Sequence, residues 1–184
     1  DNGNMELAMA LVDSGADVHA RDVSQGTPLH EACGNGNMEL VMALVNRGAN
    51  ISLVDYNNRT ALHYSARRLD DEVLKYMIEY GDVGADANLN NIIDAVDHNQ
   101  DTILHIACKV NIKKNDDTTK TVKLYNILKL LLANGANMKA LDESQKTPIH
   151  GMGISDLSVI QLLIEYGANI HHKDEDEQTL LNVA

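Results

Sequence analysis

Aromatic side chains are almost absent from this chain. Its 184 residues include neither Phe nor Trp, and Phe, Trp and Tyr together make up 3% of the sequence. Aromatic rings usually supply a large share of the buried area in a protein core. Because 44% of the residues are nevertheless hydrophobic, the composition favours helices that pack closely through Leu, Ile, Val, Met and Ala.

Cysteine and long apolar runs are also scarce. Two Cys are too few for the disulfide framework of a small secreted domain. No run of 18 apolar residues predicts a membrane-spanning helix, and the start of the sequence has no signal-peptide pattern. We therefore expect an intracellular protein without membrane insertion, and the sequence does not distinguish cytoplasm from nucleus.

Positive charge is in short supply. The chain has 15 Lys and Arg against 27 Asp and Glu, which gives a formal net charge of −12. Nucleic-acid-binding domains usually carry a basic surface, so we expect no nucleic-acid partner. The stretch 109–129 departs from this balance, because it holds six Lys against two Asp.

Motifs of known catalytic and ligand sites are missing. The sequence contains no Gly-x-Ser-x-Gly, no His-Glu-x-x-His and no phosphate loop. Gly34-Asn35-Gly36 begins like a dinucleotide loop, but Glu39 stands where the third glycine is needed. The acidic run 174–177 lacks the glycine and distal Glu of a calcium loop. We therefore expect no enzyme, no cofactor and no metal, although a catalytic triad assembled from distant residues stays open.

One short pattern recurs five times along the chain. Thr27-Pro28-Leu29-His30 has related copies that begin at Thr60, Thr102, Thr147 and Thr179. The separations of 33, 42, 45 and 32 residues indicate a unit of about 33 residues with two insertions. The insertion at about 82–90 is polar and predicts a surface loop. The one at about 111–122 predicts a loop followed by the start of a long helix.

The recurring residues have local structural reasons. Thr followed by Pro is typical of a helix start, and a His three residues after Thr can hydrogen-bond back to it as in a capping box. A later Gly, such as Gly48 or Gly81, fits the left-handed residue that ends a helix. The first complete unit thus predicts helices at 28–35 and 38–46. In the fourth unit Gly151 and Gly153 predict an irregular first helix, since Gly weakens helix interiors.

These markers resemble the ankyrin repeat family. The best copy consists of Asp22, Thr27-Pro28-Leu29-His30, Ala32, the apolar run 40–45 and Gly48-Ala49-Asn50. The resemblance implies an all-α solenoid of stacked helix-turn-helix units with extended β-turn fingers. We expect a single array over 1–184 that is a fragment of a longer repeat region. It divides into a partial unit 1–21, units of about 22–54, 55–96, 97–141 and 142–173, and a partial unit 174–184.

The resemblance also indicates where a partner would bind. In the family, partners contact the finger tips and the concave face formed by the first helices. Carried over by position, the candidate partner-binding residues are Val23, Gln25, Tyr56, Asn58, His98, Glu143 and Glu175 at the tips, and Arg67, Arg68 and Lys109 at the concave helix ends. The three basic residues lie beside the lysine-rich stretch, so we expect an acidic segment of another protein as the partner.

Other interpretations of these residues remain open. The chain is expected to be a non-catalytic protein–protein interaction module. The alternatives are a targeting or regulatory domain of a larger enzyme, channel or signalling protein whose catalytic part lies outside this fragment, and a structural spacer. The basic residues could be ordinary solvated charges. Four histidines recur at one repeat position: His30, His63, His105 and His150. They should be structural, because successive repeats lie about 10 Å apart and this keeps the histidines from sharing a metal ion. Cys33 and Cys108 fill the slot of a small buried Ala, which favours packed thiols over a redox or metal role.

Overall fold

The computed structural model describes residues 2–81, 89–110, 112, 118–152 and 157–182. The regular elements in this part of the chain are α-helices of 5 to 16 residues and 3₁₀ helices of three or four residues. The α-helices are α1 (Asn2–Asp13), α2 (Pro28–Asn35), α3 (Met38–Asn46), α4 (Ala61–Arg68), α5 (Asp71–Tyr80), α6 (Leu89–Ile93), α7 (Ile103–Cys108), α8 (Thr118–Ala133) and α9 (Leu157–Glu165). The 3₁₀ helices are η1 (Pro148–Gly151) and η2 (Leu180–Asn182).

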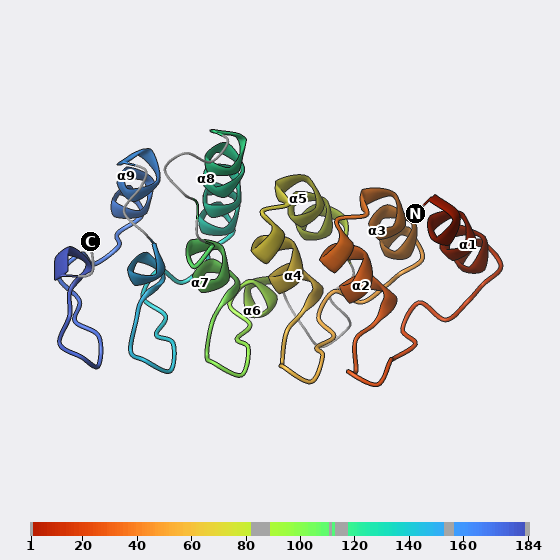
Figure 1. Cartoon of the computed structure of the whole chain (residues 1–184), viewed down its shortest axis with the longest axis horizontal. Helices are drawn as coiled ribbons and strands as arrows, with labels where there is room; N and C mark the ends of the chain where they lie inside the picture. The colour runs from red at the N-terminus through yellow and green to blue at the C-terminus, as the bar shows by residue number, and fades with distance from the viewer. Residues whose placement is uncertain (1, 82–88, 111, 113–117, 153–156, 183–184) are drawn as a thin grey trace.

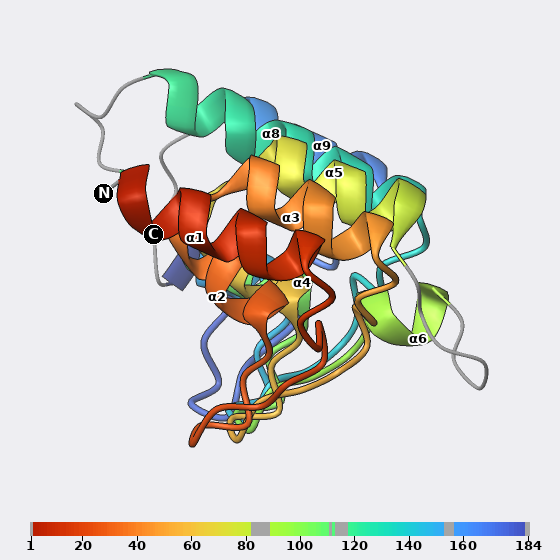
Figure 2. The same ribbon diagram turned by 90° about the vertical axis from the view of Figure 1, so that its right-hand side faces the viewer.

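The helices form two parallel layers (Figures 1 and 2). An inner layer stacks α2, α4, α7 and η1 in that order, and an outer layer stacks α1, α3, α5, α8 and α9. The finger-like connections between helix pairs extend below the inner layer, all in the same direction (Figure 1). The result is an elongated solenoid in which each helix mainly contacts its partner in the pair and the corresponding helices of the adjacent units. This confirms the predicted all-α repeat architecture.

The predicted helix boundaries of the first complete pair are confirmed. The backbone N–H of Thr27 donates to His30 Nδ1 at 3.1 Å, which satisfies one of the free donors at the start of α2. The helix ends at Gly36, whose φ of +71° is left-handed. Asn37 then caps α3 by accepting the backbone N–H of Leu40 at 3.0 Å. Local capping chemistry thus defines both helices.

Gly81 does not end its helix in the predicted way. Its φ is −72° and its backbone is extended, whereas Gly48 in the preceding unit has φ +79°. A Cβ on Gly81 would lie 2.4 Å from the carbonyl oxygen of Met77 and 2.7 Å from Cγ2 of Ile51. Glycine is therefore required here by close packing and not by a left-handed conformation.

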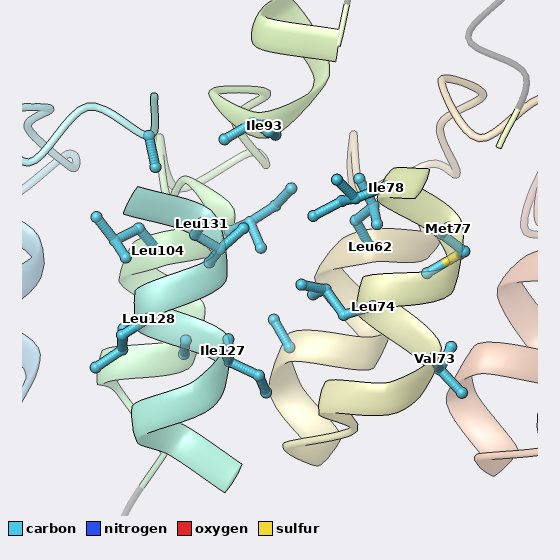
Figure 3. Close-up of a cluster of buried hydrophobic side chains, with 14 of the residues drawn as sticks. Leu62, Val73, Leu74, Met77, Ile78, Ile93, Leu104, Ile127, Leu128 and Leu131 are labelled. Carbon is cyan, nitrogen blue, oxygen red and sulfur yellow. The ribbon is translucent and has the colours of Figure 1, made fainter. Parts of the chain in front are cut away.

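The core runs continuously between the two layers. Aliphatic side chains from successive helix pairs fill it, and Leu62, Leu74, Leu104, Leu128 and Leu131 are each fully buried. Figure 3 shows these side chains between α4, α5, α7 and α8. The scarcity of aromatic residues is consistent with this packing, because slim side chains let neighbouring helices approach closely.

The first predicted insertion contains structure that the sequence did not indicate. Residues 82–88 lie outside the described residues, but Leu89 and Asn90 belong to α6 and are not part of a loop. Ile92 and Ile93 of α6 are 3% and 0% exposed and join the core. The expectation of a purely polar surface loop at 82–90 is therefore wrong at its end, because two apolar residues just beyond it draw the chain into a helix.

The second insertion and the fourth unit agree better with expectation. Residues 111 and 113–117 lie outside the described residues, and residues 118–122 form the start of α8, which at 16 residues is the longest helix in the described part of the chain. Its first turn and α6 lie on opposite sides of the helix stack (Figure 2). In the fourth unit, the four-residue 3₁₀ helix η1 stands where α2, α4 and α7 have α-helix, which confirms the irregularity predicted from the glycines.

Each described finger tip contains one left-handed residue that is not glycine. An Asp opens the finger, and its Oδ1 accepts backbone N–H groups two and four residues later, as Asp97 does from Asn99 at 2.8 Å and Asp101 at 3.1 Å. The residue three positions after the Asp has φ between 57° and 60°: Gln25, Asn58, Gln100, Gln145 and Glu177. Side chains are strained in this region by about 1–2 kcal/mol.

Replacing Gln100 with Gly should stabilise the protein. Gln100→Gly relieves the left-handed strain, and the greater freedom of Gly in the unfolded chain offsets about 0.5–1 kcal/mol of that gain. The net expectation is a rise of about 0.5 kcal/mol in the free energy of unfolding, measured by urea denaturation. Gln161→Gly, on the exposed side of α9, should instead lower it by about 1 kcal/mol; changes of the same sign would contradict the assigned strain.

Candidate functional site

The first residue after each opening Asp projects from a finger tip. Val23 is 93% exposed and Tyr56 is 62% exposed. His98, Glu143 and Glu175 hold the same position in the next three fingers and are exposed as well. Five of the predicted residues thus form one row along the tips, apolar towards the N-terminus and acidic towards the C-terminus. We refer to these five residues as the tip row.

Backbone hydrogen bonds hold the tip row in line. The N–H of Tyr56 donates to the Ser24 carbonyl at 2.9 Å, and the N–H of His98 donates to the Asn57 carbonyl at 3.0 Å. The same bond joins Glu143 to Asn99 at 3.0 Å and Glu175 to Ser144 at 3.2 Å. Because the backbone makes these contacts, the side chains of the tip row remain available to other molecules.

Two other predicted tip residues have structural roles. The Asn58 side chain is half-buried, and its Nδ2 donates to the Val96 carbonyl in the next finger. The carbonyl of Gln25 accepts a hydrogen bond from Arg21 at 2.8 Å, and Arg21 also donates to the Val54 carbonyl at 2.7 Å. Substitution of Asn58 would therefore disturb the finger itself.

A groove of about 360 Å³ lies between the inner helices α4 and α7. Its walls combine the Tyr64 ring with the aliphatic side chains of Ile106 and Val110. Three cations also line it, and His63 completes the lining; the cations are Arg59, Arg67 and Lys109. The structure thus brings two of the predicted concave residues, Arg67 and Lys109, to one site, which we call the α4–α7 groove.

Lys109 is bound by two buried carboxylates. Its Nζ donates to Asp142 Oδ2 at 2.9 Å and also to Asp101 Oδ1, and both carboxylates are about 5% exposed. Burial disfavours the charged amine, but the hydrogen bonds to both carboxylates outweigh it and hold the pKa of Lys109 above its ordinary value. Lys109 therefore joins two repeats, and its charge is compensated from beneath the groove.

Arg59 and Tyr64 are held in a similar way. Arg59 donates to Asp97 Oδ2 from Nε at 3.1 Å and from Nη2 at 3.0 Å. The Tyr64 hydroxyl donates to Asp55 Oδ2 at 2.6 Å, and burial together with this carboxylate raises the pKa of Tyr64 to about 12. The tyrosine therefore stays neutral and presents its ring to the groove.

Arg67 and Arg68 differ although they are adjacent. Arg68 donates to the Gly34 carbonyl at 3.1 Å, and its guanidinium covers Gly36, where an added Cβ would lie 2.6 Å from Nη2. Arg67 is exposed and makes no ion pair or hydrogen bond to another side chain in the part of the chain that the structure describes. Of the three predicted basic residues, Arg67 is the one whose charged group is free to bind a partner.

The recurring histidines link neighbouring units. Because His30 Nδ1 accepts the Thr27 N–H, its Nε2 carries the proton and donates to the Arg59 carbonyl at 3.0 Å. His105 makes the same link to the Lys146 carbonyl at 3.0 Å. His63 is the exception: its Nε2 makes no hydrogen bond of ordinary geometry, although the Asp101 carbonyl interacts with it electrostatically. Burial lowers the pKa of His63 to about 4.

The two thiols are buried and protonated. Cys33 and Cys108 are free, and burial raises the pKa of each to about 12. Cys33 Sγ lies 3.6 Å from Met77 Sδ in the core. Thiols of this kind are inert as nucleophiles and metal ligands. Within the described residues, no three His, Cys, Asp or Glu side chains gather in a way that could hold a metal ion.

Removing Lys109 should destabilise the protein. Lys109→Ala leaves Asp101 and Asp142 buried without their shared cation, and charge-assisted hydrogen bonds are worth about 1.5–3 kcal/mol each. Because the lysine side chain is 38% exposed, solvent screens part of this loss, and we expect about 2 kcal/mol, measured by thermal unfolding. Lys129→Ala, on the exposed side of α8, is the control; equal losses would show that the ion bridge is not stabilising.

The groove was only partly visible in the sequence. Arg67 and Lys109 were placed by repeat position, but Tyr64 and Ile106 lie in the middle of inner helices, where aromatic and aliphatic residues usually indicate core. Arg59 was missed because it precedes a helix, outside the positions that vary among tips and helix ends. One residue in the sequence could have indicated the ion pairs of Lys109: Asp101, an acidic residue directly before the recurring Thr102.

Comparison with protein families agrees with the architecture. Residues 1–91 match the model described as ankyrin repeats (3 copies), and residues 99–143 match the model of the ankyrin repeat. Among curated proteins, none matches this chain significantly. In the described part of the chain, no helix is both long and apolar enough to cross a membrane. The capped helix pairs, the fingers and these matches together establish that the chain belongs to the ankyrin repeat family.

Proposed function

We propose that this array is a non-catalytic module that binds another protein through the tip row and the concave face of its inner helices. Ankyrin repeats are generally protein–protein interaction modules, and they are typically non-catalytic. The single observation that carries the proposal is the exposure of Val23 and Tyr56, at 93% and 62%. Large side chains this exposed on an ordered tip bury little of their surface within the fold, and Tyr is enriched among residues that dominate binding energy.

The α4–α7 groove supports an acidic partner segment at the concave face. On a chain of net charge −12, the charged side chains that line this groove are cations. Charge complementarity of this kind guides association and selects partners. The same overall negative charge disfavours nucleic acid, and two free buried thiols suit a reducing, intracellular compartment.

A photo-crosslinking experiment tests the proposal. A photoreactive amino acid replaces Tyr56 in one variant and Tyr80 in the other, because both tyrosines are equally exposed, at 62% and 63%, but Tyr80 ends the outer helix α5. Each variant is irradiated in a native lysate, and crosslinked proteins are identified by mass spectrometry. We expect one partner to be enriched from Tyr56 and absent from Tyr80.

Affinity measurements then test the same partner in purified form. Tyr56→Ala should weaken its binding at least tenfold, which corresponds to about 1.4 kcal/mol, while Tyr80→Ala should leave the affinity unchanged. Crosslinks that come mainly from Tyr80, or an equal loss in both variants, would contradict the proposed surface.

A further inference from the structure

The α4–α7 groove combines an apolar wall with one cation, Arg67, that makes no ion pair in the described part of the chain. Its volume of about 360 Å³ lies at the small end of ligand pockets, about 300–1,000 Å³. An aliphatic side chain together with its neighbour fits within this volume. Tyr64, Ile106 and Val110 are each half-buried and give such a side chain an apolar surface.

The charges of the groove are mostly compensated within the protein. Asp97 accepts from Arg59, and Lys109 is shared by Asp101 and Asp142, all three carboxylates being buried. These pairs leave no excess positive charge for a strongly acidic tract. Arg67 adds one further cation at the exposed end of α4, and its guanidinium can form two parallel hydrogen bonds with one carboxylate.

We propose that the α4–α7 groove binds a segment of the partner protein in which an aliphatic residue stands next to one acidic residue. The aliphatic side chain lies against Tyr64, Ile106 and Val110, and the carboxylate pairs with Arg67. This inference rests on the proposed function and narrows it from an acidic segment to a pair of residues. Burial of one Leu side chain contributes a favourable free energy of transfer, and the Arg67 pair fixes its position.

The test is an NMR titration of the ¹⁵N-labelled protein with short acetylated and amidated peptides. The probe peptide has Leu-Glu at its centre and only Gly and Ser elsewhere, and it should cause saturable shifts centred on α4 and α7. Three peptides serve as controls: Leu-Lys, Gly-Glu and Glu-Glu at the same central positions. Each control should bind at least tenfold more weakly, because each lacks the acid or the aliphatic side chain.

Two protein variants distinguish the groove from general charge. Arg67→Glu should weaken binding of the Leu-Glu peptide at least tenfold. Lys129→Glu changes the net charge by the same amount on the outer helix α8 and should leave the affinity unchanged. Equal effects of both variants, equal binding of Leu-Glu and Leu-Lys, or shifts centred elsewhere would overturn the inference.

Failure here is distinguishable from failure of the proposed function. If the partner crosslinks from Tyr80 and not from Tyr56, the proposed function fails. If it crosslinks from Tyr56, and Arg67→Glu leaves the affinity of the purified partner unchanged, the proposed function stands and only the groove inference is wrong.

Discussion

Leu104→Ala should lower the free energy of unfolding by about 2–5 kcal/mol. Leu104 is 0% exposed and lies on α7, in the middle of the inner layer, between α4 and η1. Truncation removes buried methyl groups and leaves a cavity that the rigid helix stack closes only in part. Because a solenoid is stabilised by contacts between neighbouring units, the loss affects the interfaces on both sides. Urea denaturation followed by circular dichroism measures it.

Leu157→Ala is the control for this prediction. Leu157 starts α9 and is 71% exposed, so the same chemical change should alter the stability by no more than about 0.5 kcal/mol. Asn58→Ala is a poorer control, since Asn58 is left-handed and its side chain bonds Val96. Similar denaturation midpoints for the two leucine variants would contradict the described core.

The array should lose stability on acidification at pH values well above the ordinary pKa of a carboxylate. Burial lowers the pKa of His63 to about 4, from an ordinary value of 6.5. Between these two values His63 is protonated in the unfolded state but not in the folded state. The free energy of unfolding therefore falls as the pH drops from about 6.5 towards 4. One pKa unit corresponds to about 1.4 kcal/mol, so His63 alone accounts for a loss of about 3 kcal/mol over that window. Burial lowers the pKa of His30 and His105 as well, which adds in the same direction.

The histidine contribution can be isolated by working between pH 7.5 and 5. In this range Asp142 keeps its charge, because burial disfavours the carboxylate but hydrogen bonds from Lys109 and the backbone outweigh it and hold the pKa of Asp142 below its ordinary value. The free energy of unfolding is measured across the range for the wild type, His63→Gln and His171→Gln. His63→Gln should flatten the pH dependence, while His171→Gln, at an exposed position, should preserve it. An unchanged slope in His63→Gln would assign the acid sensitivity to other groups.

Helix boundaries were predictable where capping decides them. Thr27, Pro28 and Gly36 are all within one turn of the ends of α2, so the residues that start and stop the helix are read directly from the sequence. The irregular η1 was predictable for the same reason. In contrast, α6 is held by contacts with other parts of the chain: Ile92 and Ile93 join the core, and Asp94, just after the helix, accepts the Asn137 N–H at 2.8 Å through Oδ1. A five-residue helix has too few residues to show a period.

The candidate site was predictable in position but not in charge. Repeat register placed Arg67 and Lys109 on the concave face, and the structure finds both at one groove. The state of Lys109 depends on Asp142, which is 33 residues away, and that distance closes only when two repeats stack. The sequence therefore suggested that the charge of Lys109 is available to a partner, whereas in the fold Asp101 and Asp142 compensate it.

The row of backbone hydrogen bonds between finger tips gives the array edges of unequal stiffness. These bonds join backbone to backbone and keep the tips at fixed separations. The hydrogen bonds between the outer helices come instead from side chains, such as Tyr76 to Asn46 and Asn126 to Asp71, and exposed side chains change rotamer more readily than the backbone moves. Bending should therefore open or close the outer layer like a fan while the tip edge keeps its length. The spacing between the finger tips, Tyr56 included, would stay nearly constant when the array bends. A partner bound along the tips would therefore keep its contacts when the curvature changes.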